Sequence, residues 1–220
     1  MADKDTFVVI PAYNESKHIS DVITKVKSFC PNIIVVDDGS KDDTSKIAEK
    51  QKVIVLRHII NLGKGAGVKT GCDFAIENNA KKIILIDSDG QHEPEEIPNF
   101  LKALEGKDIV FGYRSLNEKM PFILKFGNKF INFTIKTLYG ISLKDTQCGY
   151  RAFTASTYKK IRWSASDYSM ESEMIANAGK NKLKYAQIPI KTIYHDRYKG
   201  TTVLDGIKIV INMFLWRLKR

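Results

Sequence analysis

The chain has 220 residues, of which 43% are apolar, and this is enough to build the core of one large α/β domain. The formal net charge of +10 favours polyanionic partners such as nucleic acid, anionic lipid headgroups or phosphorylated substrates. Three widely spaced cysteines without a C-x-x-C pair argue against a thiolate metal site and for a reducing compartment, and the charged N-terminal residues predict no secretory signal.

Short β-branched runs alternate with helical stretches through the first half of the chain. The pattern predicts strands at residues 6–10, 33–36, 53–56, 82–86 and 108–111, and helices at residues 16–29, 44–50, 65–78 and 94–105. Because strand–helix alternation gives right-handed crossovers, we expect an α/β fold with a mainly parallel sheet flanked by helices. Ligands of such sheets bind beyond the carboxyl ends of the strands, where several polar turns fall.

One of these turns, residues 37–40, follows the second predicted strand and reads Asp-Asp-Gly-Ser. At the open edge of the sheet its carboxylates can accept hydrogen bonds from a nucleobase or a ribose. Alternatively, Ser40 or Asp42 caps the helix that begins at Thr44. The two roles are compatible.

The next turn is rich in glycine, and residues 61–67 read Asn-Leu-Gly-Lys-Gly-Ala-Gly. Backbone N–H groups and the Lys64 ammonium can approach an anion here, at the start of a helix. The third glycine of a dinucleotide fingerprint is replaced by Val68, and no Gly-Lys-Ser/Thr sequence marks a P-loop. We therefore expect an anion site but no dinucleotide site.

Two carboxylates follow the apolar run at residues 82–86. Alternation along extended backbone places Asp87 and Asp89 on the same side, and Gln91 can add another oxygen ligand. Hard oxygen ligands suit Mg²⁺ or Mn²⁺ bound to a diphosphate. Asp, Ser and Gly are also ordinary residues of a solvated turn, and this alternative stays open on the motif alone.

Beyond Gly112 the alternation stops. Residues 120–139 predict one or two basic amphipathic helices, and residues 203–218 predict another that ends in Arg217-Leu218-Lys219-Arg220. Charges interrupt both segments too often for a membrane-spanning helix, which needs about 20 apolar residues. Their apolar faces either pack internally or dock on a membrane. We expect one domain at residues 1–202 and a C-terminal amphipathic basic helix at residues 203–220.

Seven segments, taken in order, resemble glycosyltransferase family 2, whose members invert the anomeric centre and have the GT-A fold. The resemblance is strongest to the branch of dolichol-phosphate mannose synthases and polyprenyl-phosphate glycosyltransferases. The matching segments are residues 8–15, 36–40, 61–65, 87–92, 112–114, 145–151 and 197–201. The resemblance implies a metal-dependent enzyme that moves a hexose from GDP-mannose or a UDP-sugar to dolichyl or polyprenyl phosphate.

The resemblance also implies roles for individual residues. The nucleotide sugar would be bound by Pro11, Tyr13, Glu15, Asp37, Lys64 and Asp87. The metal, Mg²⁺ or Mn²⁺, would be held by Asp87, Asp89 and Gln91. Catalytic roles fall to Asp89, Asp145, Arg114, Arg151 and Arg197. The arginines match positions near the phosphates, although an ion pair with Asp145 or Glu171 is an equally good account of any one of them.

Three acids and one histidine also have expected roles. Asp145 either acts as a general base, or orients the acceptor through Arg151, or forms a salt bridge. Glu171 and Glu173 begin an expected helix, where acids stabilise the N-terminus, and we expect no catalytic role for them. His92 is expected to be an exposed turn residue, with the alternative that it supports the metal motif that it follows.

Sugar and acceptor identity stay open, because Lys125, Cys148 and residues 202–203 depart from the pattern of the mannose synthases. One alternative keeps the fold and the donor but uses a sugar hydroxyl on a glycan or glycolipid as acceptor, with Asp145 as the base. A nucleic-acid-binding module is a remote alternative, since no reading motif is present. We expect a peripheral protein on the cytoplasmic face of a membrane, and a membrane-protein partner stays open.

Overall fold

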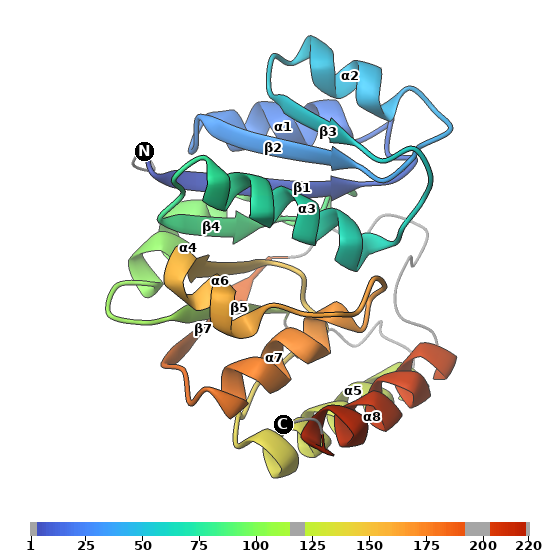
Figure 1. The fold of residues 1–220 in the computed structure, drawn as a ribbon, viewed down its shortest axis with the longest axis vertical. Coiled ribbons are helices and arrows are strands. Elements are labelled where there is room, and N and C mark those ends of the chain that lie inside the picture. The colour runs from blue at the N-terminus through green and yellow to red at the C-terminus, as the bar shows by residue number, and fades with distance from the viewer. Residues whose placement is uncertain (1–3, 115–121, 192–202, 219–220) are drawn as a thin grey trace.

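The computed structural model describes residues 4–114, 122–191 and 203–218, and it shows one sheet between two layers of helices (Figure 1). The seven strands lie in the order β3-β2-β1-β4-β6-β5-β7. Their bounds are β1 Thr6–Ala12, β2 Asn32–Asp37, β3 Ile54–Arg57, β4 Lys82–Leu85, β5 Ile109–Arg114, β6 Arg151–Thr154 and β7 Tyr185–Ile190. All neighbours are parallel except that β6 runs antiparallel to β4 and β5. The predicted mainly parallel sheet is confirmed.

Helices cover both faces of this sheet. Their bounds are α1 Ile19–Lys27, α2 Thr44–Lys50, α3 Lys64–Glu77, α4 Ile97–Ala103, α5 Phe122–Tyr139, α6 Ala155–Ile161, α7 Met170–Lys180 and α8 Val203–Leu218. Alternation along β1 sends Phe7 and Val9 into the core beneath α3, and Val8 and Ile10 into the core beneath α1. Both faces of the strand are therefore buried, as the continuous apolar run requires.

Every strand and helix expected in the first half is present, with ends shifted by at most three residues. The helix expected at residues 94–105 is divided into a short 3₁₀ turn, Pro94–Glu96, and α4. Three elements of the second half carried no usable pattern: β6, β7 and α6. The four residues of β6 include a buried arginine, so apolar periodicity does not reveal the strand.

The two amphipathic segments form α5 and α8, which pack against each other and against α7. Ile131 and Ile135 of α5, and Ile209 and Met213 of α8, are buried in the core. Other apolar residues of the same helices remain exposed, namely Phe130, Phe133, Ile211, Phe214 and Leu215. Each helix thus has one internal apolar face and a second one in solvent. None of the described helices is both long and apolar enough to cross a bilayer.

Close packing of α3 on the sheet gives a test of the fold. A Cβ at Gly71 would lie 2.4 Å from Val9 Cγ1 and 3.0 Å from Val36 Cγ2, whereas a Cβ at Gly67 would lie 3.7 Å from Pro11 Cβ. We expect Gly71→Ala to lower the free energy of unfolding by about 1–3 kcal/mol, because β1 and β2 cannot move aside. In the same helix Gly67→Ala should raise it by about 1 kcal/mol through helix propensity. Urea unfolding measures both, and equal stability of the two variants would contradict this packing.

Candidate functional site

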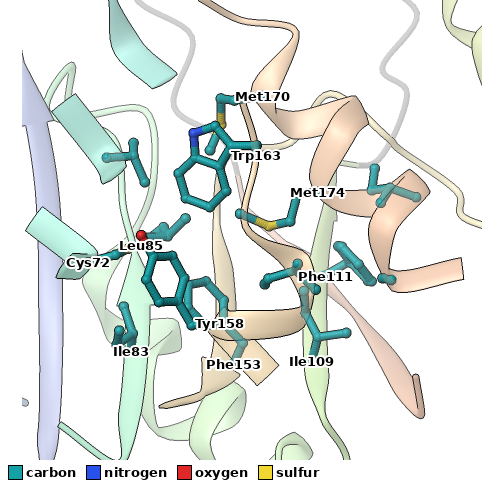
Figure 2. Close-up of a cluster of buried hydrophobic side chains, with 14 of the residues drawn as sticks. Cys72, Ile83, Leu85, Ile109, Phe111, Phe153, Tyr158, Trp163, Met170 and Met174 are labelled. Carbon is teal, nitrogen blue, oxygen red and sulfur yellow. The ribbon is translucent and has the colours of Figure 1, made fainter. Parts of the chain in front are cut away.

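A hollow lies where the carboxyl ends of β1 and β4 meet the first turns of α3 and α7. Its lining residues are Pro11, Lys64, Val68, Leu85, Asp87, Gly149, Arg151, Met170 and Glu171. Leu85 and Met170 belong to the large apolar cluster of this side of the sheet, shown in Figure 2, so the hollow has an apolar floor. Polar groups from four separate segments surround that floor.

The first turn of α3 is fixed by contact with the segment before α7. The indole Nε1 of Trp163 donates a hydrogen bond to the Gly65 carbonyl at 2.9 Å. A Cβ at Gly65 would lie 2.4 Å from the Ala165 carbonyl oxygen, so the two backbones touch only because residue 65 has no side chain. The loop before α3 is held by Asp38, whose carboxylate accepts the N–H groups of Leu62 and Gly63. These contacts place Lys64 at the hollow.

The Lys64 ammonium lies between two carboxylates. Its Nζ is 2.8 Å from Asp87 Oδ1 and 2.9 Å from Glu171 Oε1. Burial alone would lower the pKa of Lys64, but the charges of Asp87 and Glu171 raise it overall, so the ammonium stays charged. For Asp87 burial alone would raise the pKa, but the Lys64 ammonium lowers it overall, to about 2. The ion pairs therefore join β4, α3 and α7 at one point.

Asp89 lies beside Asp87 in the turn after β4. Its Oδ1 accepts the backbone N–H of Gln91 at 3.0 Å. Burial and then the negative charge of Asp87 raise the pKa of Asp89, which shows that the two carboxylates are close enough to repel each other. A bound cation would remove that repulsion. Of the predicted carboxylate pair, Asp87 lines the hollow and Asp89 follows it in the same turn.

The described residues contain no cluster of three or more His, Cys, Asp or Glu side chains arranged to hold a metal ion. Asp87 and Asp89 can supply two oxygen ligands, and Gln91 lies in the same turn. Magnesium commonly takes one or two protein carboxylates and completes its shell with water and substrate phosphates. The donor set therefore fits a divalent cation that arrives with a phosphorylated ligand.

His92 closes the same turn, and the prediction that it is exposed is wrong. It is only 7% exposed, and its ring lies 5.3 Å from the ring of Tyr150. Its Nδ1 lies 3.3 Å from the backbone nitrogen of Asp87, which donates to it. Burial lowers the pKa of His92 and so favours the neutral imidazole that can accept this bond. His92 therefore helps to hold the backbone of Asp87 in the turn after β4.

Arg114, at the end of β5, pairs with Asp145 through two hydrogen bonds. Nε donates to Oδ2 at 2.7 Å and Nη2 donates to Oδ1 at 3.3 Å. Asp145 is 2% exposed and also accepts the N–H of Gln147. Burial would raise the pKa of Asp145, but Arg114 lowers it below the ordinary value. The ion-pair alternative is confirmed for Arg114, and Asp145 is a weak base in this arrangement.

The guanidinium of Arg151 is 1% exposed and directed at backbone carbonyls. It donates to the carbonyl oxygens of Cys148, Thr146 and Glu171 at 2.8–3.1 Å. These bonds hold the loop before β6 against the first turn of α7, and thereby shape the hollow. The geometry gives no support to the predicted phosphate contact of Arg151. The corresponding prediction for Arg197 lies outside the described residues.

The residues predicted for the nucleotide lie along the ends of β1 and β2. Asp37 is buried: Oδ1 accepts the Ser40 N–H at 2.9 Å, and Oδ2 lies 3.3 Å from Arg57 Nε without a hydrogen bond to any described residue. Pro11 reaches the hollow, whereas Tyr13 is 41% exposed beyond it. The register that pairs Ala12 with Asp37 brings these two strand ends to one edge.

Glu15 is buried just beyond the end of β1, and its carboxylate lies 2.9 Å from His18 Nδ1. Its backbone N–H donates to Thr44 Oγ1 at 2.8 Å, which joins the turn after β1 to the start of α2. Glu15 is therefore engaged with helix starts on the α1 and α2 side of the sheet. It does not line the hollow that holds Lys64.

Sequence reasoning missed Glu171. Its neighbour Glu173 accepts the N–H groups of Ser164 and Ala165 and so supports the loop, as an acid at a helix start commonly does. Glu171 instead turns into the hollow, where it is 3% exposed and pairs with Lys64. Both acids stand in the same first turn, and only the packing of α7 beside α3 separates their roles. No local signal distinguishes them.

Comparison with known proteins identifies the family. Residues 7–162 match the family model "Glycosyl transferase family 2". The chain belongs to glycosyltransferase family 2. The predicted family is confirmed, and the match spans the segments that contribute Lys64, Asp87, Asp89 and Asp145.

Two relatives extend along nearly the whole chain. The "UDP-N-acetylglucosamine--dolichyl-phosphate N-acetylglucosaminyltransferase" of Methanococcus voltae is 36% identical over 99% of this chain and 98% of its own length. The "Polyprenol monophosphomannose synthase" of Mycolicibacterium smegmatis is 29% identical over 95% of this chain and 84% of its own. Family 2 relatives thus include enzymes named for different sugars.

Solved structures confirm the GT-A fold predicted for this family 2 chain. Glucosyl-3-phosphoglycerate synthase from Mycobacterium tuberculosis, crystallised with phosphoglyceric acid, aligns with a TM-score of 0.75 over 97% of this chain and 80% of that one. The same enzyme with Mn²⁺, UDP and phosphoglyceric acid aligns with a TM-score of 0.74. At 20% identity both alignments concern the fold alone.

The Arg114–Asp145 pair predicts a pH effect on this family 2 chain. Because the pKa of Asp145 is lowered from its ordinary 3.8 in the folded state, its contribution to stability is present above that value and is lost as the pH falls below it. We expect Asp145→Asn to cost about 1.5–3 kcal/mol at pH 7, since Arg114 loses a charged partner. The difference in the free energy of unfolding between Asp145→Asn and the wild type should become smaller as the pH falls from 5 to 3.

Urea unfolding at pH 7, 5 and 3 measures this gap. Asp21→Asn is the control, because Asp21 pairs with Lys25 on the surface with 65% of its side chain exposed. That variant should stay within about 0.5 kcal/mol of the wild type at every pH. A gap for Asp145→Asn that is the same at all three pH values would contradict the assignment.

Proposed function

We propose that this chain transfers a hexosyl unit from a nucleotide sugar to dolichyl or polyprenyl phosphate, with inversion at the anomeric carbon. The names of relatives at 36% and 29% identity support the acceptor class. One observation carries the proposal: Asp145, the acid predicted as the base of a hydroxyl-accepting enzyme, is held by Arg114 and has a lowered pKa. A phosphate acceptor is already an oxyanion at neutral pH and needs no strong base.

A UDP-sugar is the first candidate for the donor. The relative named for a UDP-sugar is both more similar and matched over more of its length than the relative named for mannose transfer. The diphosphate would lie at Lys64 and Asp87, and the nucleoside would extend along the ends of β1 and β2 toward Asp37. Oδ2 of Asp37, which has no hydrogen bond to any described residue, offers an acceptor to that nucleoside.

Mg²⁺ or Mn²⁺ would be held by Asp87 and Asp89, with Gln91 in the same turn. The cation would stabilise the negative charge that develops on the departing nucleoside diphosphate. Arg114 and Asp145 would orient the acceptor side of the site as a rigid pair. Arg151 would act at a distance, by holding the loop before β6. Arg197 stays a prediction from sequence.

The lipid acceptor requires contact with a membrane, and the exposed faces of α5 and α8 are suited to it. Five large apolar residues there are about half exposed or more: Phe130, Phe133, Ile211, Phe214 and Leu215. Basic residues accompany them in the last turns, Lys136 in α5 and Arg217 in α8. Apolar side chains beside basic ones favour an anionic interface. We propose peripheral docking there, on the cytoplasmic face.

A transfer assay tests the function. Purified protein with Mn²⁺ or Mg²⁺ is incubated with labelled nucleotide sugars and a short polyprenyl phosphate, and label is counted in the organic phase. We expect label from at least one UDP-sugar or GDP-mannose, and none in the presence of excess chelator. Asp89→Ala should lose at least about 100-fold in rate because the cation loses a ligand, whereas Asp145→Asn should keep a measurable fraction.

The variants separate the two acceptor classes. If Asp145→Asn is as inactive as Asp89→Ala, then Asp145 acts as a base and the hydroxyl acceptor becomes the better hypothesis. If a free nucleoside diphosphate appears while the lipid stays unlabelled, the acceptor is wrong. Full activity of Asp89→Ala in chelator would contradict the metal assignment.

Vesicle flotation tests the docking proposal. The double variant Phe133→Ser/Phe214→Ser should lose most of its binding to vesicles of phosphatidylglycerol and phosphatidylcholine, because about 2–3 kcal/mol of apolar transfer is lost at each site. Ile59→Ser is the control, since Ile59 is fully exposed in the loop between β3 and α3, and β3 is the edge strand that lies away from α5 and α8 in Figure 1. Equal losses for the two proteins would show that the faces of α5 and α8 are not the contact.

A further inference from the structure

Glu171 is fixed in the hollow by two separate contacts. Its backbone carbonyl accepts a hydrogen bond from Arg151 Nη1 at 2.8 Å, and its Oε1 lies 2.9 Å from the Lys64 ammonium. The residue is 3% exposed. Backbone and side chain are thus both held, so the direction of the carboxylate is set before any ligand binds.

The second oxygen of this carboxylate has no hydrogen-bond donor in the part of the chain that the structure describes. Oε2 of Glu171 is buried and has no hydrogen-bond partner among the described residues. A buried carboxylate oxygen without a donor is unfavourable, and such groups in folded proteins commonly mark a place where a ligand completes the bonding. Because Glu171 lines the hollow, its free oxygen is available to a molecule bound there.

The other lining groups restrict what that molecule offers. Val68, Leu85 and Met170 are apolar, and the ammonium of Lys64 is already shared between Asp87 and Glu171. An ionised carboxylate only accepts hydrogen bonds, so the partner must donate one. A diphosphate has no donor at neutral pH, whereas each hydroxyl of a sugar has one.

Gly149 keeps this acceptor within reach of a sugar on the diphosphate. A Cβ at this position would lie 2.7 Å from Asp87 Oδ2 and 3.1 Å from Lys64 Nζ. Only glycine therefore allows the loop before β6 to come this close to Asp87 and Lys64. Asp87, Lys64 and Glu171 line the same hollow, so a ligand bound at Asp87 and Lys64 lies beside Glu171.

We propose that Glu171 Oε2 accepts a hydrogen bond from one ring hydroxyl of the transferred sugar, and so determines which sugar the enzyme takes. This inference rests on the proposed function, because it assumes a nucleotide sugar in the hollow. Lys64 acts as the positioning residue, since its bond to Oε1 aims Oε2 at the ligand. Glu171 discriminates at the donor, not at the acceptor.

Donor binding without any acceptor tests the proposal. Calorimetry with Mn²⁺ compares the wild type and Glu171→Ala for a nucleoside diphosphate, for the nucleotide sugar that the transfer assay selects, and for its analogues with each ring hydroxyl in turn replaced by hydrogen. At one position the deoxy analogue should bind about tenfold or more weakly to the wild type, but less than about twofold more weakly to Glu171→Ala. At the other positions, replacement of the hydroxyl should weaken binding to the two proteins by equal factors.

Two further variants serve as controls for this calorimetric comparison. Glu171→Gln keeps the size of the side chain and replaces Glu171→Ala if that variant does not fold; the position-specific loss should shrink in it as well. Ser172→Ala removes a hydroxyl beside Glu171 that bonds to Gln147, and it should keep the full loss at the same position. If the deoxy analogues lose the same affinity for the wild type and for the Glu171 variants at every position, the inference is overturned and the proposed function is not. Failure of every nucleotide sugar to bind, while the protein is folded, would overturn the proposed function and the inference together.

Discussion

The site depends on one ammonium between two carboxylates. Lys64 joins Asp87 at the end of β4 to Glu171 at the start of α7, at 2.8 and 2.9 Å. Three segments far apart in the sequence meet there, and each brings a charge that is costly to bury alone. Removing one member of such a group commonly costs about 3–5 kcal/mol, because it leaves a charge without its partner. The triad therefore ties β4, α3 and α7 together at the hollow.

That meeting is made possible by positions where a side chain is absent. The segments carrying Lys64 and Glu171 approach closely because Gly65 lies against the Ala165 carbonyl, and Gly149 lies against Asp87 and Lys64 with no room for a Cβ. Trp163 adds a hydrogen bond to the backbone of the same turn, from within the apolar cluster of Figure 2. The packing of the apolar cluster beneath the hollow thus sets the distances between the ionised groups above it.

Sequence patterns predicted the first half of the fold well, because buried parallel strands and amphipathic helices have local periods. The carboxylates at Asp87 and Asp89 were also found, since they follow a strand directly. What was missed depends on contacts between distant segments. β6 enters antiparallel between β4 and β5 with a buried arginine in it, and nothing local marks Arg151 as internal. Glu171 and Glu173 look alike in sequence, and only the contact between the first turns of α7 and α3 turns one into the hollow and leaves the other to support a loop.

The charges around the hollow bear on how a basic protein can use an acidic site. Asp87, Asp89 and Glu171 stand near two cationic groups, the Lys64 ammonium and the Arg151 guanidinium that also lines the hollow, so carboxylates are in excess there although the chain as a whole carries +10. The guanidinium of Arg114 is balanced by Asp145. These carboxylates would repel a diphosphate unless it arrived with a divalent cation that offsets their charge. The metal requirement that we propose is therefore a consequence of the local charge, and the positive charge elsewhere on the surface is left to attract the donor and the membrane from a distance.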